Sequence, residues 1–447
     1  MTVQSGFGKS TGKVFFANCA TRLQLGRQTK DAEPMIILTL NAGSNSLKFE
    51  IVAAEAEGSA ESRSTFGSSL VAGSYDNLGK EHSAFSLFEN KRPRRSEEIE
   101  IRDHGHAADL LLKWIEGGGA AGRGVRNLGD IDRVAHRVVH GADCFTGPAQ
   151  MTEKVIRQID ALEDIAPLHN AAALKVIRAA QAKIGSRLPM IAVFDTVFHQ
   201  TIPDEAALYP LPIDLARRHK IRRYGFHGIS HRYMMLRYAQ IAKRAINKLN
   251  LITLHLEGGS SAAAIQAGKS VDTSMGFTPL EGLMMGTRSG DIDPALVSYL
   301  MRKEKMDTER VEDFLNKECG LLAVSNVSAD TRELEKHLSE ASVDLAVNMF
   351  CYRTRKYIGA YLAVLEGAEA IIVGGGIGEN TPFVRERIFK QFGWCGAVLD
   401  RQRNREVIDR EGPITTPDSP LQVWVIPTQE GLMMAKEVAD HSAQRGT

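Results

Sequence analysis

The sequence predicts an α/β protein built by internal duplication, because one strand–turn–strand unit occurs twice. The first copy, residues 35–52, is a buried apolar strand, a polar turn at 41–48 and a second strand. The second copy has an apolar strand at 251–256, the turn 257–261 and a small apolar run at 262–265. Residues 38–44 align with 254–260, about half a chain away, which indicates duplication.

Small polar groups and one basic group fill the first turn. Asn41, Ser44, Ser46 and Lys48 can offer hydroxyls, backbone N–H groups and an ammonium to phosphate oxygens. An ordinary hairpin turn with a solvated lysine is the alternative, since Gly, Asn and Ser are common in turns. The second copy favours phosphate binding: one such turn per half could clamp a nucleotide, as in actin-like ATPases and sugar kinases.

Composition excludes several classes of protein. A chain of 447 residues is expected to form about two to three domains, and its 43% hydrophobic content is enough for sizeable cores. A net charge of +1 argues against nucleic-acid or membrane-surface partners. The five cysteines are scattered without a Cys-x-x-Cys pair, which fits a reducing cytosol. No apolar run approaches the roughly 20 residues that cross a bilayer. We expect a cytoplasmic protein.

Residues 1–34 differ from the rest of the chain. Up to Lys30 they contain five Lys or Arg and no acid, which loosely suits a transit peptide. We favour a disordered extension, or translation that starts at Met35. The segment 6–10 imitates a Walker loop, but its first Gly would fall at Val3 and no strand precedes it. The segment 268–270 fails in the same way, with Ala263 in the first position.

Hydrophobic periodicity, together with the positions of Gly, Pro and capping residues, predicts the remaining elements. Before the second copy we expect strands over 67–102 and 131–141, helices over 106–116 and 152–164, a helix from Asn170 to about 184 that Asn170 caps, and a strand over 189–194. After it we expect a functional loop over 271–294, a helix over 341–366, strands over 370–373 and 423–426, and a closing helix. Residues 374–380 should form a Gly-rich anion-binding turn before a helix capped by Thr381.

Two residues stand out on these strands. Arg137 lies on a strand close to a Gly, where a side chain often points into a cleft. Asp195 follows a buried strand, where open α/β sheets place catalytic groups, although a turn or cap aspartate is an equal alternative.

Two histidine pairs have a spacing that could bind a metal on a helix. His136 and His140 lie in a β-branched segment, so a strand is expected and the rings would not converge. His227 and His231 have no evident third ligand. We predict no zinc site at either pair.

Six segments in register resemble the acetate and propionate kinase family, from Met35 to about residue 438. They are 41–48, 136–141, 194–200, 224–228, 272–294 and 376–380. The resemblance implies a duplicated actin-like α/β fold, with residues 35–195 plus 431–447 in one domain and 196–430 in the other. It implies reversible phosphoryl transfer from ATP to acetate, giving acetyl phosphate and ADP for acetyl-CoA biosynthesis, by a cytoplasmic homodimer.

The resemblance also implies a role for each matching residue. Asn41 and Glu430 would hold Mg²⁺, with Mn²⁺ as an alternative, and Lys48 would line the first phosphate turn with Ser44 and Ser46. Arg137 and Arg288 would hold the carboxylate and the phosphoryl group. His227 would donate a hydrogen bond to that phosphoryl group, and Asp195 would be the catalytic acid. Val139, Leu168, Phe226 and Pro279 would enclose the methyl group. His255, Leu256, Glu257, Gly258, Gly259, Asp330, Thr331, Arg332, Gly376, Ile377, Gly378, Glu379 and Asn380 would contact the nucleotide.

The chemistry agrees with these roles. In-line phosphoryl transfer needs positioning and charge neutralisation more than a base. Because acetate is ionised at neutral pH, we expect Asp195 to orient Mg²⁺ or the attacking oxygen rather than accept a proton.

The chain departs from the family pattern at three points. Glu257-Gly258-Gly259 replaces the usual Gly-Asn-Gly, Asn45 replaces a Ser, and Gln429-Glu430-Gly431 replaces Asn-Glu-Glu. These departures bear on nucleotide binding more than on acetate. Alternatives are a propionate or butyrate kinase, a sugar kinase or actin-like ATPase, a non-catalytic nucleotide sensor, and a relative using another phosphate donor such as pyrophosphate.

Overall fold

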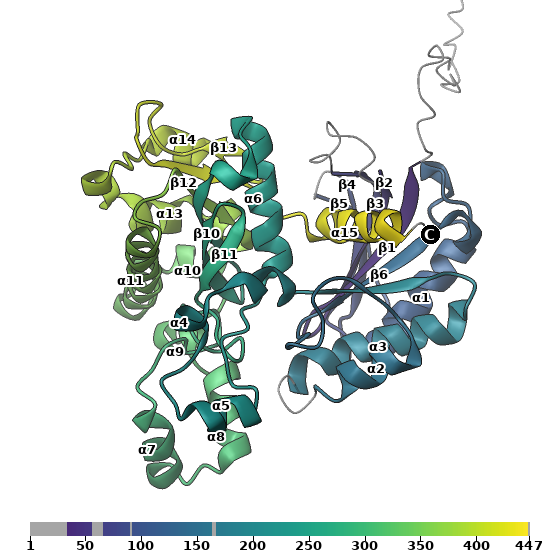
Figure 1. Ribbon diagram of the computed structural model, residues 1–447, viewed down its shortest axis with the longest axis horizontal. Helices are drawn as coiled ribbons and strands as arrows, with labels where there is room; N and C mark the ends of the chain where they lie inside the picture. The colour runs from purple at the N-terminus through teal and green to yellow at the C-terminus, as the bar shows by residue number, and fades with distance from the viewer. Residues whose placement is uncertain (1–33, 56–65, 90–91, 163–166, 446–447) are drawn as a thin grey trace, which may run out of the picture. The chain divides into compact units, whose positions relative to one another are not determined.

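The structure is a computed structural model that describes residues 34–55, 66–89, 92–162 and 167–445 (Figure 1). The side chains of residues 92–93 and 167–169 are also outside the description. The N-terminal 33 residues, on which the expectations of a disordered extension or a transit peptide fall, lie outside it as well.

The strands form two sheets. The eight-stranded sheet contains β1 (Met35–Ala42), β2 (Leu47–Ala54), β3 (Ser68–Asp76), β4 (Ala84–Glu89), β5 (Arg92–Glu98), β6 (Arg133–Val138), β7 (Ala149–Gln150) and β8 (Met190–Phe194). The six-stranded sheet contains β9 (Asn250–Leu256), β10 (Ser260–Gln266), β11 (Lys269–Thr273), β12 (Ala370–Gly374), β13 (Gly412–Pro413) and β14 (Gln422–Val425).

Both sheets contain the same five-stranded arrangement, which confirms the predicted duplication. The first has the order β3-β2-β1-β6-β8, and the second has β11-β10-β9-β12-β14. In each sheet, two consecutive hairpins give three antiparallel strands. Two further strands then extend the sheet beside β1 or β9 and run parallel to it. The two predicted phosphate turns, β1 to β2 and β9 to β10, occupy equivalent positions in the two sheets.

Helices connect and cover the strands. The α-helices are α1 (His104–Glu116), α2 (Glu153–Asp160), α3 (Pro167–Ile184), α4 (Asp204–Ala207), α5 (Ile213–Arg218), α6 (Gly228–Ala242), α7 (Ala295–Lys303), α8 (Thr308–Lys317), α9 (Gly320–Ser325), α10 (Thr331–Lys336), α11 (Ala341–Val364), α12 (Gly375–Asn380), α13 (Pro382–Phe389), α14 (Arg401–Glu406) and α15 (Glu430–Arg445). In the described part of the chain, none of them combines the length and apolar character needed to span a membrane.

Alternation along β1 gives the first sheet two buried faces. Leu38 and Leu40 pack with α1 and α3, whereas Ile37 belongs to a separate core with α6 and α15. In Figure 1, α15 lies on the face of the sheet opposite α1 and α3. Met433 and Met434 of α15 share this second core with Leu251 of β9, so apolar side chains from both sheets contribute to it.

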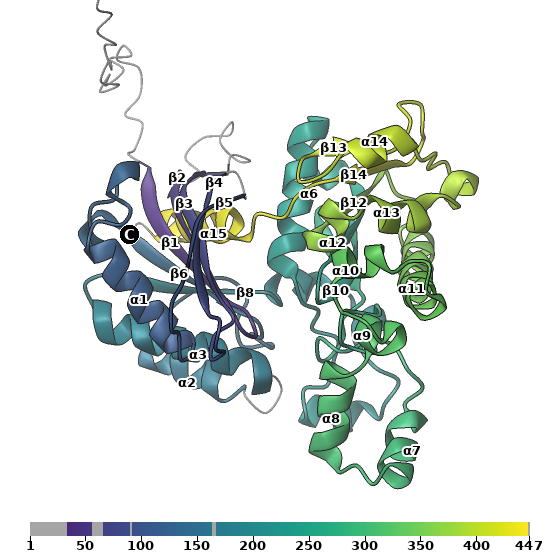
Figure 2. The same ribbon diagram turned by 180° about the vertical axis from the view of Figure 1, so that it is seen from behind.

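The second sheet is covered by α11 on its other face. Ile252 and Leu254 of β9 pack with Phe350 and Ile358 of α11, and α12 and α13 border the same core. Figure 2 shows α11, α12 and α13 grouped beside β12. The predicted helix over 341–366 and strand over 370–373 are therefore confirmed within two residues.

Two sequence-based predictions are wrong in detail. Asn170 does not cap a helix, because α3 already begins at Pro167. Its buried amide instead bonds both backbone groups of His140, at 3.1 Å each. Residues 374–380 do not form an open turn, since 375–380 are helical as α12. Thr381 precedes α13 with Pro382 at the first position, as expected, but its side chain makes no capping bond.

Five buried histidines should make stability depend on pH, since burial lowers the pKa of His227 and His231 well below the ordinary value and also lowers the pKa of three others. Burial lowers the pKa of His136 to about 3, and those of His140 and His199 to about 4. The pKa of histidine in an unfolded chain is about 6.5, so below that pH the unfolded state binds more protons than the folded state. The free energy of unfolding should therefore fall as pH drops from about 6.5 to about 4, by about 1.4 kcal/mol per pH unit for each histidine.

Urea unfolding at pH values between about 7.5 and about 4.5 measures this slope. His136→Leu removes one such group, whose Nε2 lacks a hydrogen-bond partner among the described residues. Its slope should be shallower than that of the parent. Equal slopes in the two proteins would contradict the assignment.

Candidate active site

A buried ion pair lies at the centre of the candidate site. Arg137 donates from Nε to Asp195 Oδ1 at 3.0 Å and from an Nη to Oδ2 at 2.6 Å. Its other Nη donates to Asn41 Oδ1 at 2.9 Å. The Asn41 amide donates to Glu430 Oε2 at 2.6 Å, and the Ser230 hydroxyl donates to Oε1 at 2.5 Å. Five side chains thus form one connected network.

The fold explains why these groups meet. β1, β6 and β8 are parallel neighbours, so their carboxyl ends lie at one edge of the sheet. Asn41 is near the end of β1, Arg137 is near the end of β6, and Asp195 directly follows β8. Glu430 is the first residue of α15, which packs against β1 and β2.

Burial and charge oppose each other in this network. Burial acts to lower the pKa of Arg137, but the carboxylates of Asp195 and Glu430 raise it above its ordinary value. Burial raises the pKa of Asp195, and Arg137 acts against this rise. Burial also acts to raise the pKa of Glu430, yet Arg137 keeps it below its usual value. Two short parallel bonds favour the ionised form of both Arg137 and Asp195.

A cavity of about 310 Å³ adjoins this network. Its lining includes seven of the residues predicted for catalysis and for acid binding: Arg137, Val139, Asp195, Phe226, His227, Pro279 and Arg288. Ser44 of the first turn and Gly259 of the second also line it, so both copies of the duplicated unit reach the cavity. Leu168 lies in α3, but its side chain is outside the described residues.

Arg288 and His227 line the same cavity, and both come from the second half of the chain. A Cβ added to Gly259 would lie 3.3 Å from an Arg288 nitrogen and 3.6 Å from His227 Nε2, so these groups gather around this glycine. Arg288 donates to the carbonyl of Pro279 at 3.4 Å, and burial lowers the pKa of its guanidinium. Val139, Phe226, Met275 and Met285 form a small apolar cluster beside them.

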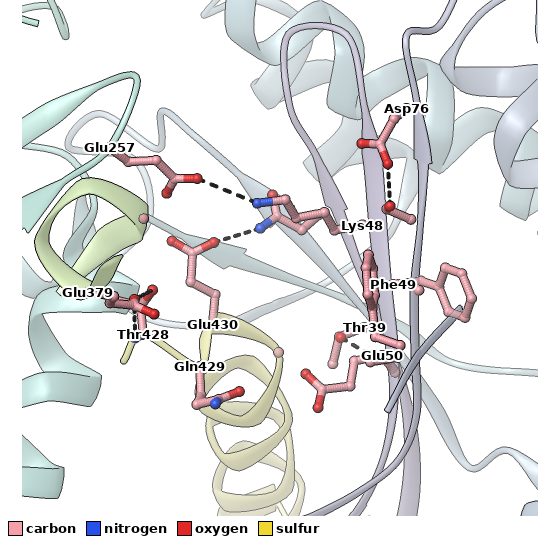
Figure 3. Close-up of a pocket in the computed structure, with 17 residues that line it drawn as sticks. Thr39, Lys48, Phe49, Glu50, Asp76, Glu257, Glu379, Thr428, Gln429 and Glu430 are labelled. Atoms are coloured by element: carbon pink, nitrogen blue, oxygen red, sulfur yellow. Dashed lines mark hydrogen bonds and ion pairs between the residues drawn. The ribbon is translucent and has the colours of Figure 1, made fainter. Parts of the chain in front are cut away.

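A second cavity, of about 380 Å³, has Asn41, Lys48, Glu257, Gly376, Glu379 and Glu430 in its lining. Figure 3 shows Lys48 and Glu257 extending toward one another, and their charged groups are 3.7 Å apart. Lys48 comes from the first copy and Glu257 from the second. The side chain predicted to meet phosphate is therefore paired with the acid that departs from the family pattern, and this carboxylate raises the pKa of Lys48.

The other predicted nucleotide contacts lie in several places. His255 Nε2 is 3.4 Å from a Glu257 oxygen, whereas Leu256 and Ile377 belong to the core. Asp330 caps α10 and pairs with Arg332. Thr331 contacts Thr381, Gly258 borders open space, and Gly378 and Asn380 lie in α12.

Glu379, another predicted nucleotide contact, is nearly fully buried and accepts hydrogen bonds within the chain. Its Oε1 accepts from the Gly375 and Thr428 N–H groups, at 3.0 and 2.8 Å. The carboxylate therefore holds the start of α12 to the segment that leads into α15.

Several residues at the site were missed by the sequence analysis. Asn316 and Lys317 line the cavity of about 310 Å³ from the end of α8, which looks like an ordinary surface helix in sequence. Ser230 supports Glu430, and Ser261 bonds His227. Ser230 lies between the two members of the histidine pair His227 and His231, and Ser261 ends the predicted turn at 257–261, but a lone hydroxyl gave no distinguishing signal.

A duplicated α/β fold, with a cavity that gathers two arginines and a histidine beside a buried carboxylate, defines a phosphotransferase of the actin-like class.

Comparison with known proteins narrows this class. The acetokinase family pattern matches residues 36–436. The chain is 44% identical to an acetate kinase of Solibacter usitatus over 406 residues, which cover 90% of this chain and 97% of that protein. It also resembles the structures of Porphyromonas gingivalis acetate kinase and a Francisella tularensis propionate kinase, with TM-scores of 0.78 and 0.79. Identities are 36% and 33%, and 90% of this chain and 98% of each of those chains are covered. The chain belongs to the acetokinase family.

Mutation should distinguish the role of Arg288, which is catalytic, from that of Arg137, which also affects stability. Removing a donor that stabilises charge in a transition state typically lowers kcat by about 10²–10³-fold. Arg288→Ala should show this loss while KM for ATP stays within a few-fold, measured by steady-state kinetics. Arg178→Ala, an exposed arginine of α3 paired with Asp160, is the matched control.

Arg137 has an additional structural role. Arg137→Ala should lose activity and also about 3–5 kcal/mol of stability, because Asp195 remains buried without its partner. Arg137→Lys should not restore full activity, since the bidentate fork is lost. If either alanine variant keeps most of its kcat, the assignment of that arginine fails.

Proposed function

We propose that this protein transfers a phosphoryl group reversibly between ATP and acetate, giving acetyl phosphate and ADP. The observation that carries the proposal is the cavity of about 310 Å³, where Arg137 and Arg288 lie beside an apolar wall of Val139, Phe226 and Pro279. Cationic donors suit a carboxylate and a phosphoryl group, and the apolar wall suits a short alkyl group.

Each residue then has a physical task. Arg137 and Arg288 neutralise charge on the acetate carboxylate and on the phosphoryl group in flight. His227 adds a hydrogen bond to the phosphoryl oxygens. Asp195 holds the Arg137 guanidinium in a fixed plane through two bonds. Acetate needs no deprotonation at neutral pH, so positioning replaces general-base catalysis.

Asn41 and Glu430 would hold a Mg²⁺ ion that is shared with the nucleotide, once the Asn41 amide turns its oxygen toward the ion, because in this structure its nitrogen faces Glu430 and its oxygen faces Arg137. Among the described residues no group of three or more His, Cys, Asp or Glu could hold a metal by itself. Mg²⁺ commonly uses only one or two protein carboxylates and takes its other ligands from water and phosphate, so one carboxylate and one amide oxygen are a suitable donor set. Mn²⁺ would suit the same oxygens. The ion would offset charge on the ATP phosphates.

In this proposal the nucleotide binds at the cavity of about 380 Å³ and contacts the segments 255–259, 330–332 and 376–380. The sheets support a domain division at 35–195 plus 431–447 against 196–430, because β8 ends at Phe194, β9 begins at Asn250 and α15 covers the first sheet.

We also propose a homodimer in the cytoplasm. Leu345, Met349 and Tyr352 form an apolar stripe along α11, with exposed fractions of 36–55%. A second copy could cover this stripe. The four cysteines in the described part of the chain are all free, which suits a reducing compartment.

A hydroxamate assay tests the reaction and the choice of acid. Acetate should be the best substrate among acetate, propionate, butyrate and glycerol. Propionate is the second candidate, since a propionate kinase is among the similar structures. Val139→Ala enlarges the apolar wall, so it should shift the kcat/KM ratio toward propionate. One methylene is worth about 1–3 kcal/mol, which limits the shift to roughly 10- to 200-fold.

An unchanged ratio in Val139→Ala would place the methyl site elsewhere. ADP formation with glycerol but with none of the acids, measured by an assay for ADP because glycerol phosphate forms no hydroxamate, would favour a sugar-kinase-like activity. If the protein forms no ATP from acetyl phosphate and ADP, this result would favour a nucleotide sensor without catalysis.

The pair between Lys48 and Glu257 should weaken ATP binding. A carboxylate about 6 Å from a phosphate charge, at an effective dielectric constant of about 20, repels it by roughly 3 kcal/mol. Glu257 also pairs with the one basic side chain that the first turn offers to phosphate. Phosphate must therefore compete with Glu257 for Lys48.

Restoring the family pattern tests this effect. Glu257→Gly with Gly258→Asn should lower KM for ATP at least several-fold and leave KM for acetate nearly unchanged. Residue 258 has space for the side chain, since a Cβ there meets nothing within 4 Å. Glu257→Asp keeps the charge and serves as the control. A KM for ATP that stays the same or rises in the double variant would show that this turn does not oppose the nucleotide.

A further inference from the structure

A chain of buried hydrogen bonds leads from His227 into the core of the second half of the protein. His227 Nδ1 lies 2.8 Å from Ser261 Oγ, which lies 2.8 Å from His231 Nε2. His231 Nδ1 lies 2.7 Å from Thr253 Oγ1. Ser261, His231 and Thr253 are fully buried, on β10, α6 and β9, and His227 immediately precedes α6. The chain therefore connects the cavity to the middle of the second sheet.

The number of hydrogens restricts this chain to two arrangements. A serine hydroxyl has one hydrogen and can accept twice, but if both histidines donated to Ser261 its own buried hydrogen would have no acceptor among the described residues, so Ser261 donates to one histidine and accepts from the other. Burial lowers the pKa of both His227 and His231 well below the ordinary value, so each ring is neutral with one N–H. Nearby Arg137 and Arg288 act on His227 in the same direction. All donors in the chain must then point toward the cavity or all must point toward the core.

Thr253 decides between the two arrangements. If the donors point toward the core, the Thr253 hydroxyl accepts from His231 and its own hydrogen needs an acceptor. Among the described residues Thr253 Oγ1 has no other partner, so that hydrogen would be buried and unsatisfied. If the donors point toward the cavity, Thr253 donates to His231 Nδ1, His231 Nε2–H donates to Ser261, and Ser261 donates to His227 Nδ1. Every buried hydrogen then has an acceptor.

We propose that Thr253, His231 and Ser261 are positioning residues that fix His227 in the tautomer with its proton on Nε2. Nε2 is on the side of the ring beside Gly259, in the cavity that also holds Arg288. The fixed tautomer presents an N–H donor to phosphoryl oxygens, whereas the other tautomer would present a lone pair to an anion. This inference rests on the proposed function for its consequence, but the tautomer itself is a property of the free protein.

Thr253→Val and Thr253→Ser test the proposal as a matched pair. Valine keeps the shape of threonine and removes the hydroxyl, while serine keeps the hydroxyl. Nitrogen-15 NMR of histidine-labelled protein reports the tautomer, with the His227 signals assigned by their loss in His227→Gln. The parent and Thr253→Ser should show Nε2 protonated and Nδ1 unprotonated. Thr253→Val leaves His231 Nδ1 without a partner in both arrangements, as an unpaired donor in one and an unpaired acceptor in the other, so the preference for one direction falls and protonation of His227 should be shared between its two nitrogens.

Kinetics should follow the NMR result. Thr253→Val should lower kcat by about 10-fold, less than full removal of a donor, with KM for acetate and ATP within about two-fold. Thr253→Ser should restore kcat. If Thr253→Val fails to fold, Ser261→Ala cuts the same chain and should give the same two results. A parent protein with His227 protonated on Nδ1, or a tautomer and kcat that are unaffected in Thr253→Val and Ser261→Ala, would overturn the proposal. The predicted tautomer in a protein without acetate-dependent activity would instead overturn the proposed function.

Discussion

The two-bond contact between Arg137 and Asp195 is the constraint on which the site depends. A buried guanidinium must have its charge matched, and Asp195 can match it because β6 and β8 are parallel neighbours. The plane of the guanidinium is then set by the sheet rather than by a flexible loop. Asn41 and Glu430 attach to the same group, so the end of β1 and the start of α15 are aligned with it.

Much of this arrangement follows from the sequence because strand ends obey simple rules. The apolar runs before Asn41 and Asp195 predicted the strands, and parallel strands bring their ends to one edge. The duplicated pattern predicted the second sheet for the same reason. Arg288 and Pro279 could be placed only through family resemblance, since residues 274–294 contain no helix or strand whose period would orient them.

Long-range partners were beyond the sequence. The Asn170 amide looks like a helix cap locally, yet its partner is the backbone of His140. Glycines at 374–376 suggest a turn, but Glu379 accepts from Gly375 and Thr428 and holds this segment as the short helix α12. Glu257 looks like a lone acid among phosphates until Lys48 is found opposite it. Each partner comes from a distant segment, which spacing within one segment does not reveal.

The position of α15 has a consequence for biosynthesis. This helix supplies Met433, Met434 and Val438 to the core that also contains Ile37 and Val52 of the first two strands. One face of the first sheet therefore stays uncovered until the whole second sheet has been translated. During that interval a nascent chain exposes apolar strands, the kind of surface that favours aggregation. The N-terminal half can complete its fold only after the end of α15 has left the ribosome.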